Sequence, residues 1–131
     1  MELSDGILLD NMRSYHGKNG RAISRSSNGG MTWSKVTLDQ ALVEPVCQAS
    51  MIRAGNRILF ANPASTKRER LTVRVSEDDG LSWTQGKVLH AGPAAYSSLA
   101  LLPDREVACF FEAGDSSPYE KLVFVRFKLE N

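Results

Sequence analysis

The chain has 131 residues, which is enough for one domain with a real hydrophobic core. Hydrophobic residues make up 42% and charged residues 24%, which argues against a disordered tail or a coiled coil, and no apolar run approaches the roughly 20 residues that span a bilayer. A formal net charge of +1 does not produce the strong positive electrostatic field that is typical of nucleic-acid binders, so any functional positive charge must be local.

The apolar residues alternate or occur in short runs, and they never recur at helical spacing over three turns. The sequence therefore predicts an all-β fold, in which Gly, Pro, Asn, Asp or Ser bounds each strand. Gly-Asn within 54–56 and Pro-Asp within 103–105 predict two hairpin turns. In chain order, strands are expected at 7–13, 22–26, 46–53, 57–62, 71–76, 87–90, 97–102, 106–112 and 121–129.

An internal repeat follows two of these strands. The octapeptides 26–33 and 76–83 share five residue types at identical places and are offset by 50 residues, which is typical of a β-propeller or another β array. In each, an Asx side chain can bond backbone N–H groups two residues on, Gly supplies a positive φ and Trp covers the turn. Two unrelated Asx-Gly hairpins are the alternative. The matched residues are Ser26, Asn28, Gly30, Thr32 and Trp33, and then Ser76, Asp78, Gly80, Ser82 and Trp83.

The octapeptides resemble Asp-boxes, S-x-D-x-G-x-T-W, which occur in hairpins of sialidases and several other propellers; the first carries Asn28 in place of Asp. The stretches EPVCQAS, NPAS, RERLTVR, AYSSL and FFEAG follow in order, so that the whole chain resembles the C-terminal part of exo-α-sialidases (neuraminidases) of the Asp-box, or BNR-repeat, family. The resemblance implies two to three antiparallel four-stranded blades of a six-bladed propeller. These are a partial blade over 1–43, a blade over 44–92 and a last blade over 93–131.

The resemblance also implies a site for a terminal sialic acid, on a sialylated glycan or free. Arg13 and Arg68 match arginines that bind the sugar carboxylate, for which the planar guanidinium fork is suited. Tyr96 matches the nucleophile of a retaining mechanism. Judged without the resemblance, Arg13 is an ordinary strand-end residue, Arg68 belongs to a charged loop and Tyr96 is a packing residue.

Other parts of the family site have no match in this chain. The resemblance places the carboxylate that activates the tyrosine just before Met1, so Glu2 does not match it, and the first arginine and the acid/base Asp belong to earlier blades. Glu112 resembles a Glu that supports the first arginine, or it is a solvent-facing carboxylate at a strand end. Six blades at this period need roughly 300 residues, so we expect less than half of the enzyme and little or no turnover from this chain alone.

The histidines and cysteines indicate no metal site and no further catalytic function. We expect no cofactor and no metal, because His16 and His90 lack a second ligand at metal spacing and are predicted at the surface. Cys47 and Cys109 are expected within strands as small buried hydrophobes. Residues 1–6 contain no export signal, so any such signal is expected upstream, and the compartment stays open.

The expected partners follow from charge and from the incomplete propeller. The densest cationic run lacks interleaved aromatic residues, which argues against nucleic acid. Exposed blade faces predict self-association of the isolated chain. A non-catalytic Asp-box propeller that binds glycans or proteins is the alternative to an enzyme. The cationic run consists of Lys67, Arg68, Arg70 and Arg74.

Overall fold

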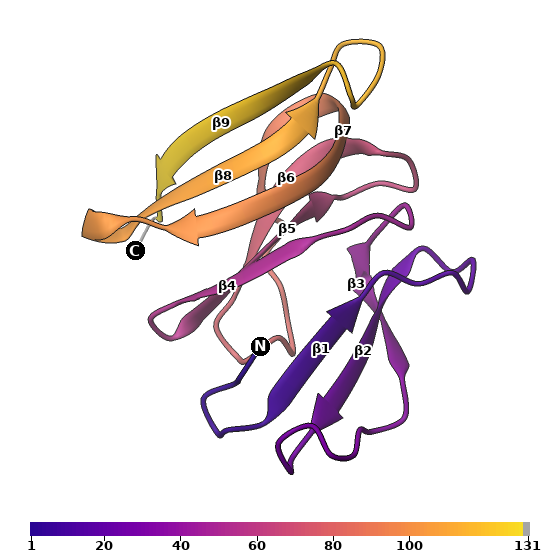
Figure 1. Ribbon diagram of the computed structural model, residues 1–131, viewed down its shortest axis with the longest axis vertical. Helices are drawn as coiled ribbons and strands as arrows, with labels where there is room; N and C mark the ends of the chain where they lie inside the picture. The colour runs from indigo at the N-terminus through magenta and orange to yellow at the C-terminus, as the bar shows by residue number, and fades with distance from the viewer. Residues whose placement is uncertain (130–131) are drawn as a thin grey trace.

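The computed structural model describes residues 1–129, and the strands in that range form two antiparallel sheets (Figure 1). The all-β prediction is confirmed, since the described residues contain no α-helix. A three-stranded sheet has the order β1 (Leu8–Met12), β2 (Gly20–Ser26) and β3 (Thr37–Val43). A six-stranded sheet follows in chain order, with β4 (Ser50–Ala54), β5 (Arg57–Pro63), β6 (Glu69–Ser76), β7 (Lys87–Leu101), β8 (Glu106–Ala113) and β9 (Lys121–Lys128). A 3₁₀ turn, η1 (Pro103–Arg105), joins β7 to β8.

The long strand β7 connects two halves of the larger sheet. Its first part pairs with β6, its second part pairs with β8, and it bends between them (Figure 1). The sequence predicts two strands here, 87–90 and 97–102, with a loop between them, and that prediction is wrong. Ala94 and Ala95 are fully buried in the bend. Their small side chains allow close packing where the register with β8 shifts.

The strand β3 is missing from the sequence prediction. Its core-facing Leu42 is fully buried, but Asp39 and Gln40 interrupt the alternation that would have revealed it. The ladder is irregular at the same place, because Gly20 pairs with Val43 whereas the next residue, Arg21, pairs with Asp39. Such a bulge removes the period of two on which the prediction depends.

The strand expected at 46–53 starts only at Ser50. Val46 has a φ of 55°, a left-handed conformation that is unusual for a β-branched residue and incompatible with a strand. Cys47 therefore lies in the preceding loop, contrary to the expectation, whereas Cys109 lies in β8 as expected. Both cysteines are free and buried, which confirms the prediction that they are small core residues.

The first Asp-box turn is held by its own side chains. The Ser26 hydroxyl donates to Asn28 Oδ1 (3.0 Å) and accepts from the Gly30 N–H (2.9 Å). Asn28 Oδ1 also accepts from the Thr32 N–H at 2.9 Å, so the Asx side chain reaches four residues on rather than two. Gly30 has a φ of 87°, a left-handed conformation that residues other than glycine rarely adopt, so the turn requires glycine here.

The second Asp-box turn repeats this arrangement with a carboxylate. The Ser76 hydroxyl donates to Asp78 Oδ1 (2.8 Å), which accepts from the Ser82 N–H (2.9 Å). The Ser82 hydroxyl and amide, with Ser76, lower the pKa of Asp78 from 3.8 to about 2. Trp83 differs from its counterpart, because its indole N–H donates to Asp39 Oδ2 in β3 (3.1 Å).

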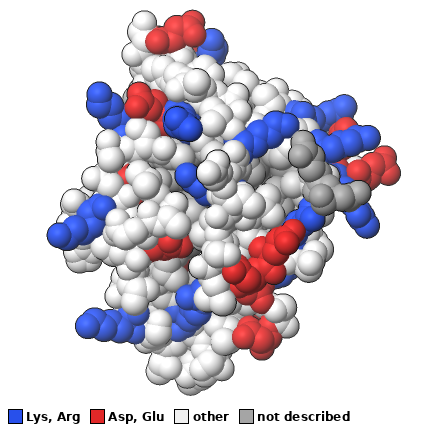
Figure 2. Space-filling view, turned by 180° about the vertical axis from the view of Figure 1, so that it is seen from behind, with Lys and Arg blue, Asp and Glu red and all other residues white. Residues whose placement is uncertain are grey.

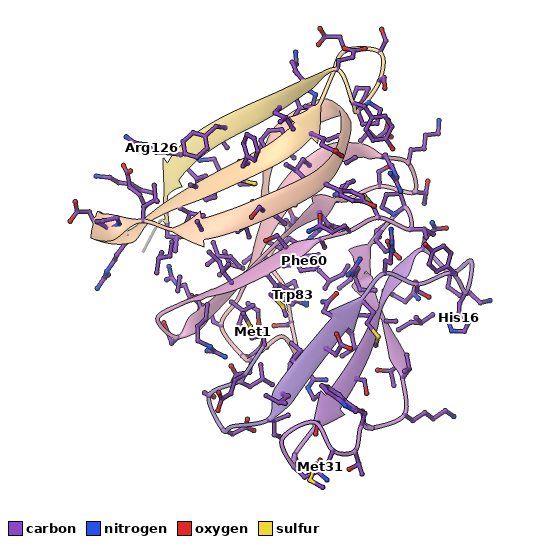
Figure 3. All side chains as sticks on the ribbon, in the orientation of Figure 1. Met1, His16, Met31, Phe60, Trp83 and Arg126 are labelled. Atoms are coloured by element: carbon purple, nitrogen blue, oxygen red, sulfur yellow. The ribbon has the colours of Figure 1, made fainter. Side chains whose placement is uncertain are left out.

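Two hydrophobic clusters form the core of the described residues. The larger cluster fills the space between the halves of the six-stranded sheet, with buried residues from β5, β6, β7 and β8. The smaller cluster joins the three-stranded sheet to β5. Figure 3 shows Trp83 and Phe60 side by side in the middle of the molecule, with ring centroids 5.6 Å apart. The buried members of the smaller cluster are Leu3, Leu9, Ile23 and Ile58.

Candidate functional site

Tyr96 is the meeting point of the residues singled out by sequence. It lies in β7, within the strand rather than at a strand start, and its side chain is 42% exposed. Arg13, which follows β1 and is 83 positions away in sequence, donates from Nη1 to the Tyr96 hydroxyl at 3.4 Å. The guanidinium carbon of Arg68, in the loop between β5 and β6, lies 5.7 Å from the centroid of the Tyr96 ring. Three segments thus bring two cations to one exposed phenol.

Arg68 is held from two sides. It donates from Nη1 to the Tyr119 hydroxyl (2.6 Å) and from Nη2 to the Val46 carbonyl (3.3 Å). Burial lowers the pKa of Arg68, but interactions with Cys47 and Tyr119 outweigh it, and the net direction is upward. The hydrogen bond with Tyr96 is the main cause that raises the pKa of Arg13. Both guanidinium groups therefore stay charged at any physiological pH.

Tyr119 is a contact of Arg68 that the sequence does not predict. It lies in the loop between β8 and β9, and it is 60% exposed. The Glu120 carboxylate fixes this loop by accepting from three successive backbone N–H groups, of Asp115, Ser116 and Ser117, at 2.8–3.0 Å. These bonds lower the pKa of Glu120. Sequence offers only one signal for it, an aromatic residue in a polar turn.

Glu112 supports the backbone at the same place. Its Oε2 atom accepts from the Tyr96 N–H at 3.0 Å, so within residues 1–129 it contacts the main chain of Tyr96 rather than the hydroxyl. Gln48 fixes the next residue, since its side-chain amide donates to and accepts from the Ser97 backbone at 2.9 Å each. An open hollow of about 310 Å³ lies beside Tyr96, and its lining includes Gln48, Glu112 and Phe110.

The other candidates lie outside this cluster. His90 contacts the Gly114 carbonyl (3.1 Å), and Figure 3 shows His16 projecting at the edge of the molecule.

The part of the chain that the structure describes contains no group of three potential metal ligands, and no helix in it is long and apolar enough to cross a membrane. Lys and Arg are interspersed with Asp and Glu on the face shown in Figure 2. Burial raises the pKa of Cys109 to about 12.

Comparison with known proteins agrees with the repeat and with the fold. The sequence matches the BNR repeat-like domain family over residues 1–109. A sialidase of Micromonospora viridifaciens is 37% identical over 130 residues, in an alignment that covers 91% of this chain and 20% of that relative. The chain belongs to the BNR-repeat sialidase family. These sialidase relatives support membership of a glycoside hydrolase family.

Further sialidases match at the level of sequence and of structure. A sialidase of Bacteroides fragilis is 30% identical, with 86% of this chain and 23% of that relative covered. A Hadza microbial sialidase superposes with a TM-score of 0.80 at 30% identity, covering 95% of this chain and 25% of that one. A leech intramolecular trans-sialidase, complexed with 2,7-anhydro-Neu5Ac, gives a TM-score of 0.80 at 25% identity, with coverage of 97% and 22%.

The fold prediction is therefore confirmed, because these structural relatives are sialidase β-propeller domains. The chain spans between a fifth and a quarter of the length of the relatives described above. The boundaries between blades at 43/44 and 92/93 stay a prediction. They are compatible with the change from the first sheet to the second after β3, and with the bend of β7.

Proposed function

We propose that this chain supplies part of the active site of a retaining exo-α-sialidase, which hydrolyses terminal sialic acids from glycoconjugates. One observation carries the proposal: Arg13 and Arg68, from different loops, both contact the exposed side chain of Tyr96. Two fixed guanidinium groups suit a carboxylate, and a sialic acid carries one beside its anomeric carbon. The sialidase relatives support the same substrate class.

In the proposed mechanism each residue has one role. Arg13 and Arg68 bind the sugar carboxylate and orient the anomeric carbon toward Tyr96. The Tyr96 oxygen loses its proton to a carboxylate and attacks that carbon, while the glycosidic bond breaks and the leaving oxygen takes a proton from an acid/base Asp; water then hydrolyses the covalent glycosyl-enzyme with retention of configuration. That carboxylate and that Asp belong to the parts of the family site that have no match in this chain. A neutral phenol suits this role, because a carboxylate nucleophile would repel the substrate carboxylate. Glu112 holds the backbone of the nucleophile in place.

The isolated chain is proposed to bind without turnover. A tyrosine hydroxyl is a weak nucleophile unless a base takes its proton. Among residues 1–129, the hydrogen-bond partner of the Tyr96 hydroxyl is the Arg13 cation, and no carboxylate reaches it. Binding without catalysis is also the behaviour of the alternative, a non-catalytic Asp-box module that recognises glycans or proteins.

Two assays on the purified 131-residue chain test the proposal. N-acetylneuraminic acid is titrated against the wild type, Arg68→Ala and Arg126→Ala; the last removes an exposed arginine on β9 that pairs with Glu106 at 3.6 Å. We expect the wild type and Arg126→Ala to bind the sugar, and Arg68→Ala to have lost binding. A fluorogenic sialoside is expected to stay uncleaved. Cleavage by the wild type that is absent in Tyr96→Phe would show that the chain is catalytically competent.

The outer face of β8 and β9 supports the proposed self-association. Phe110, Leu122 and Phe124 are 46%, 63% and 60% exposed, and Phe110 and Phe124 are directly opposite each other across the strands. A contiguous apolar patch of this kind is typical of a contact surface. We propose that a second copy covers it when the chain is alone in solution. Sedimentation that gives a single monomeric species would contradict this.

A further inference from the structure

A buried ion pair lies behind the cluster around Tyr96. Arg21, in β2, and Glu44, directly after β3, are 3% and 0% exposed, and Arg21 Nη1 lies 3.6 Å from Glu44 Oε2. The Arg21 guanidinium carbon also lies 5.6 Å from the centroid of the Phe60 ring. Burying both charges carries a desolvation cost that apolar residues of the same size would avoid, so the ion pair is weak evidence of a role in stability.

Three hydrogen bonds of the pair go to the segment that carries Arg13. Arg21 donates from Nε to Asn11 Oδ1 (2.7 Å) and from Nη2 to the Asn11 carbonyl (3.0 Å). Glu44 Oε1 accepts from the Ser14 N–H at 2.8 Å. The pair therefore fixes the chain at Asn11 and at Ser14, on either side of Arg13.

The same pair holds the backbone that anchors Arg68. Glu44 Oε2 accepts from the Cys47 N–H (2.9 Å), and Arg21 Nη1 donates to the Cys47 carbonyl (2.8 Å). These bonds fix the residue next to Val46, whose carbonyl accepts from Arg68 and whose left-handed φ of 55° is strained for a β-branched residue. Strain of this kind persists only where the surroundings impose it.

We propose that Arg21 and Glu44 are positioning residues that set the spacing of Arg13 and Arg68 around Tyr96, and so match the site to one small carboxylate. The inference rests on the proposed function of these three residues. An arginine is required because one planar group serves acceptors on two segments, which a lysine ammonium cannot do in the same geometry. Glutamate is required because its two oxygens receive one amide from each segment.

The test compares Glu44→Gln with Glu106→Gln, a matched neutralisation in the partly exposed pair of Glu106 with Arg126. The first readout needs no ligand: the ¹³Cζ resonance of Tyr96, in tyrosine-labelled protein, reports the contact with Arg13. Glu44→Gln is expected to move this resonance in the direction that Arg13→Ala moves it, while Glu106→Gln leaves it in place. The second readout is affinity for N-acetylneuraminic acid, expected to fall about tenfold in Glu44→Gln only.

Arg21→Lys keeps a positive charge beside Glu44, so it tests the inference if Glu44→Gln fails to fold. It is expected to melt cooperatively and yet to shift the Tyr96 resonance and weaken binding. If the wild type does not bind N-acetylneuraminic acid, the proposed function is wrong, and the Tyr96 resonance alone decides the positioning role. A folded Glu44→Gln or Arg21→Lys chain with an unshifted Tyr96 resonance would overturn the inference.

Discussion

Trp33 and Trp83 occupy the same place in the two Asp-boxes, but the structure predicts very different contributions to stability. Trp33 is 45% exposed, and its indole N–H donates to the Gly30 carbonyl within its own turn (3.0 Å). Trp83 packs between the sheets against the smaller hydrophobic cluster, with the Phe60 ring 5.6 Å away, and bonds to Asp39 in β3. Only Trp83 joins two sheets.

The expected losses of unfolding free energy follow from these contacts. Truncating a fully buried Trp to Ala costs about 3–5 kcal/mol. Trp83 is only partly buried, so its transfer free energy is reduced, but the aromatic pair adds about 1 kcal/mol and the hydrogen bond to the Asp39 carboxylate about 1.5 kcal/mol. We expect Trp83→Ala to cost about 3 kcal/mol. Trp33→Ala loses only a half-exposed ring and a local bond, at about 1 kcal/mol.

Thermal unfolding followed by far-UV circular dichroism measures both variants without relying on tryptophan fluorescence. For a chain of this size 1 kcal/mol corresponds to about 4 °C in Tm. Trp83→Ala is then expected to melt about 12 °C below the wild type, and Trp33→Ala about 4 °C below it. Equal losses, or a larger loss at Trp33, would refute the assignment of Trp83 as the link between the sheets.

Three further outcomes are expected from buried or hydrogen-bonded groups. The pKa of Asp78 is about 2 in the folded chain and 3.8 for an ordinary carboxyl of this type, as in the unfolded chain. Its stabilising contribution is therefore complete above about pH 4 and is lost as the pH falls toward 2. The free energy of unfolding of Asp78→Asn should therefore fall less steeply than that of the wild type as the pH is lowered from about 4 to about 2. Burial raises the pKa of both Cys47 and Cys109, so neither thiol should react with a thiol reagent at pH 8 until the chain unfolds; fast reaction in the folded state would contradict their placement. Phe111→Ala, in the larger cluster at 2% exposure, should cost about 3–5 kcal/mol by urea unfolding, and a loss below about 1 kcal/mol would contradict that packing.

The Asp-box turns show why much of the fold is readable from sequence. Serine, Asx and glycine act within eight residues, so their chemistry does not depend on the rest of the chain. The strand β3 cannot be read from local sequence in this way. Its Asp39 accepts a hydrogen bond from Trp83, 44 positions away, so the polar residue that interrupts the strand pattern serves a distant contact. Likewise, the bend in β7 depends on Ala94 packing against distant strands, and alanine alone predicts no bend.

The candidate site divides in the same way. Arg13, Arg68 and Tyr96 are recognisable because short motifs surround them, and the structure brings them together. Their supports are not recognisable, because Glu44 looks like any loop carboxylate until burial and its amide donors are known. Tyr119 contacts Arg68 across 51 positions, a distance that no local pattern spans.

We propose above that Arg13 and Arg68 form a site for a carboxylate beside Tyr96. The most direct measurement compares binding of N-acetylneuraminic acid with binding of its carboxyl methyl ester, by NMR titration of the 131-residue chain. We expect the wild type to prefer the free acid by about tenfold or more, since a charge-assisted hydrogen bond contributes about 1.5–3 kcal/mol, and we expect Arg68→Ala to lose that preference. Equal binding of the acid and the ester by the wild type would contradict the proposal.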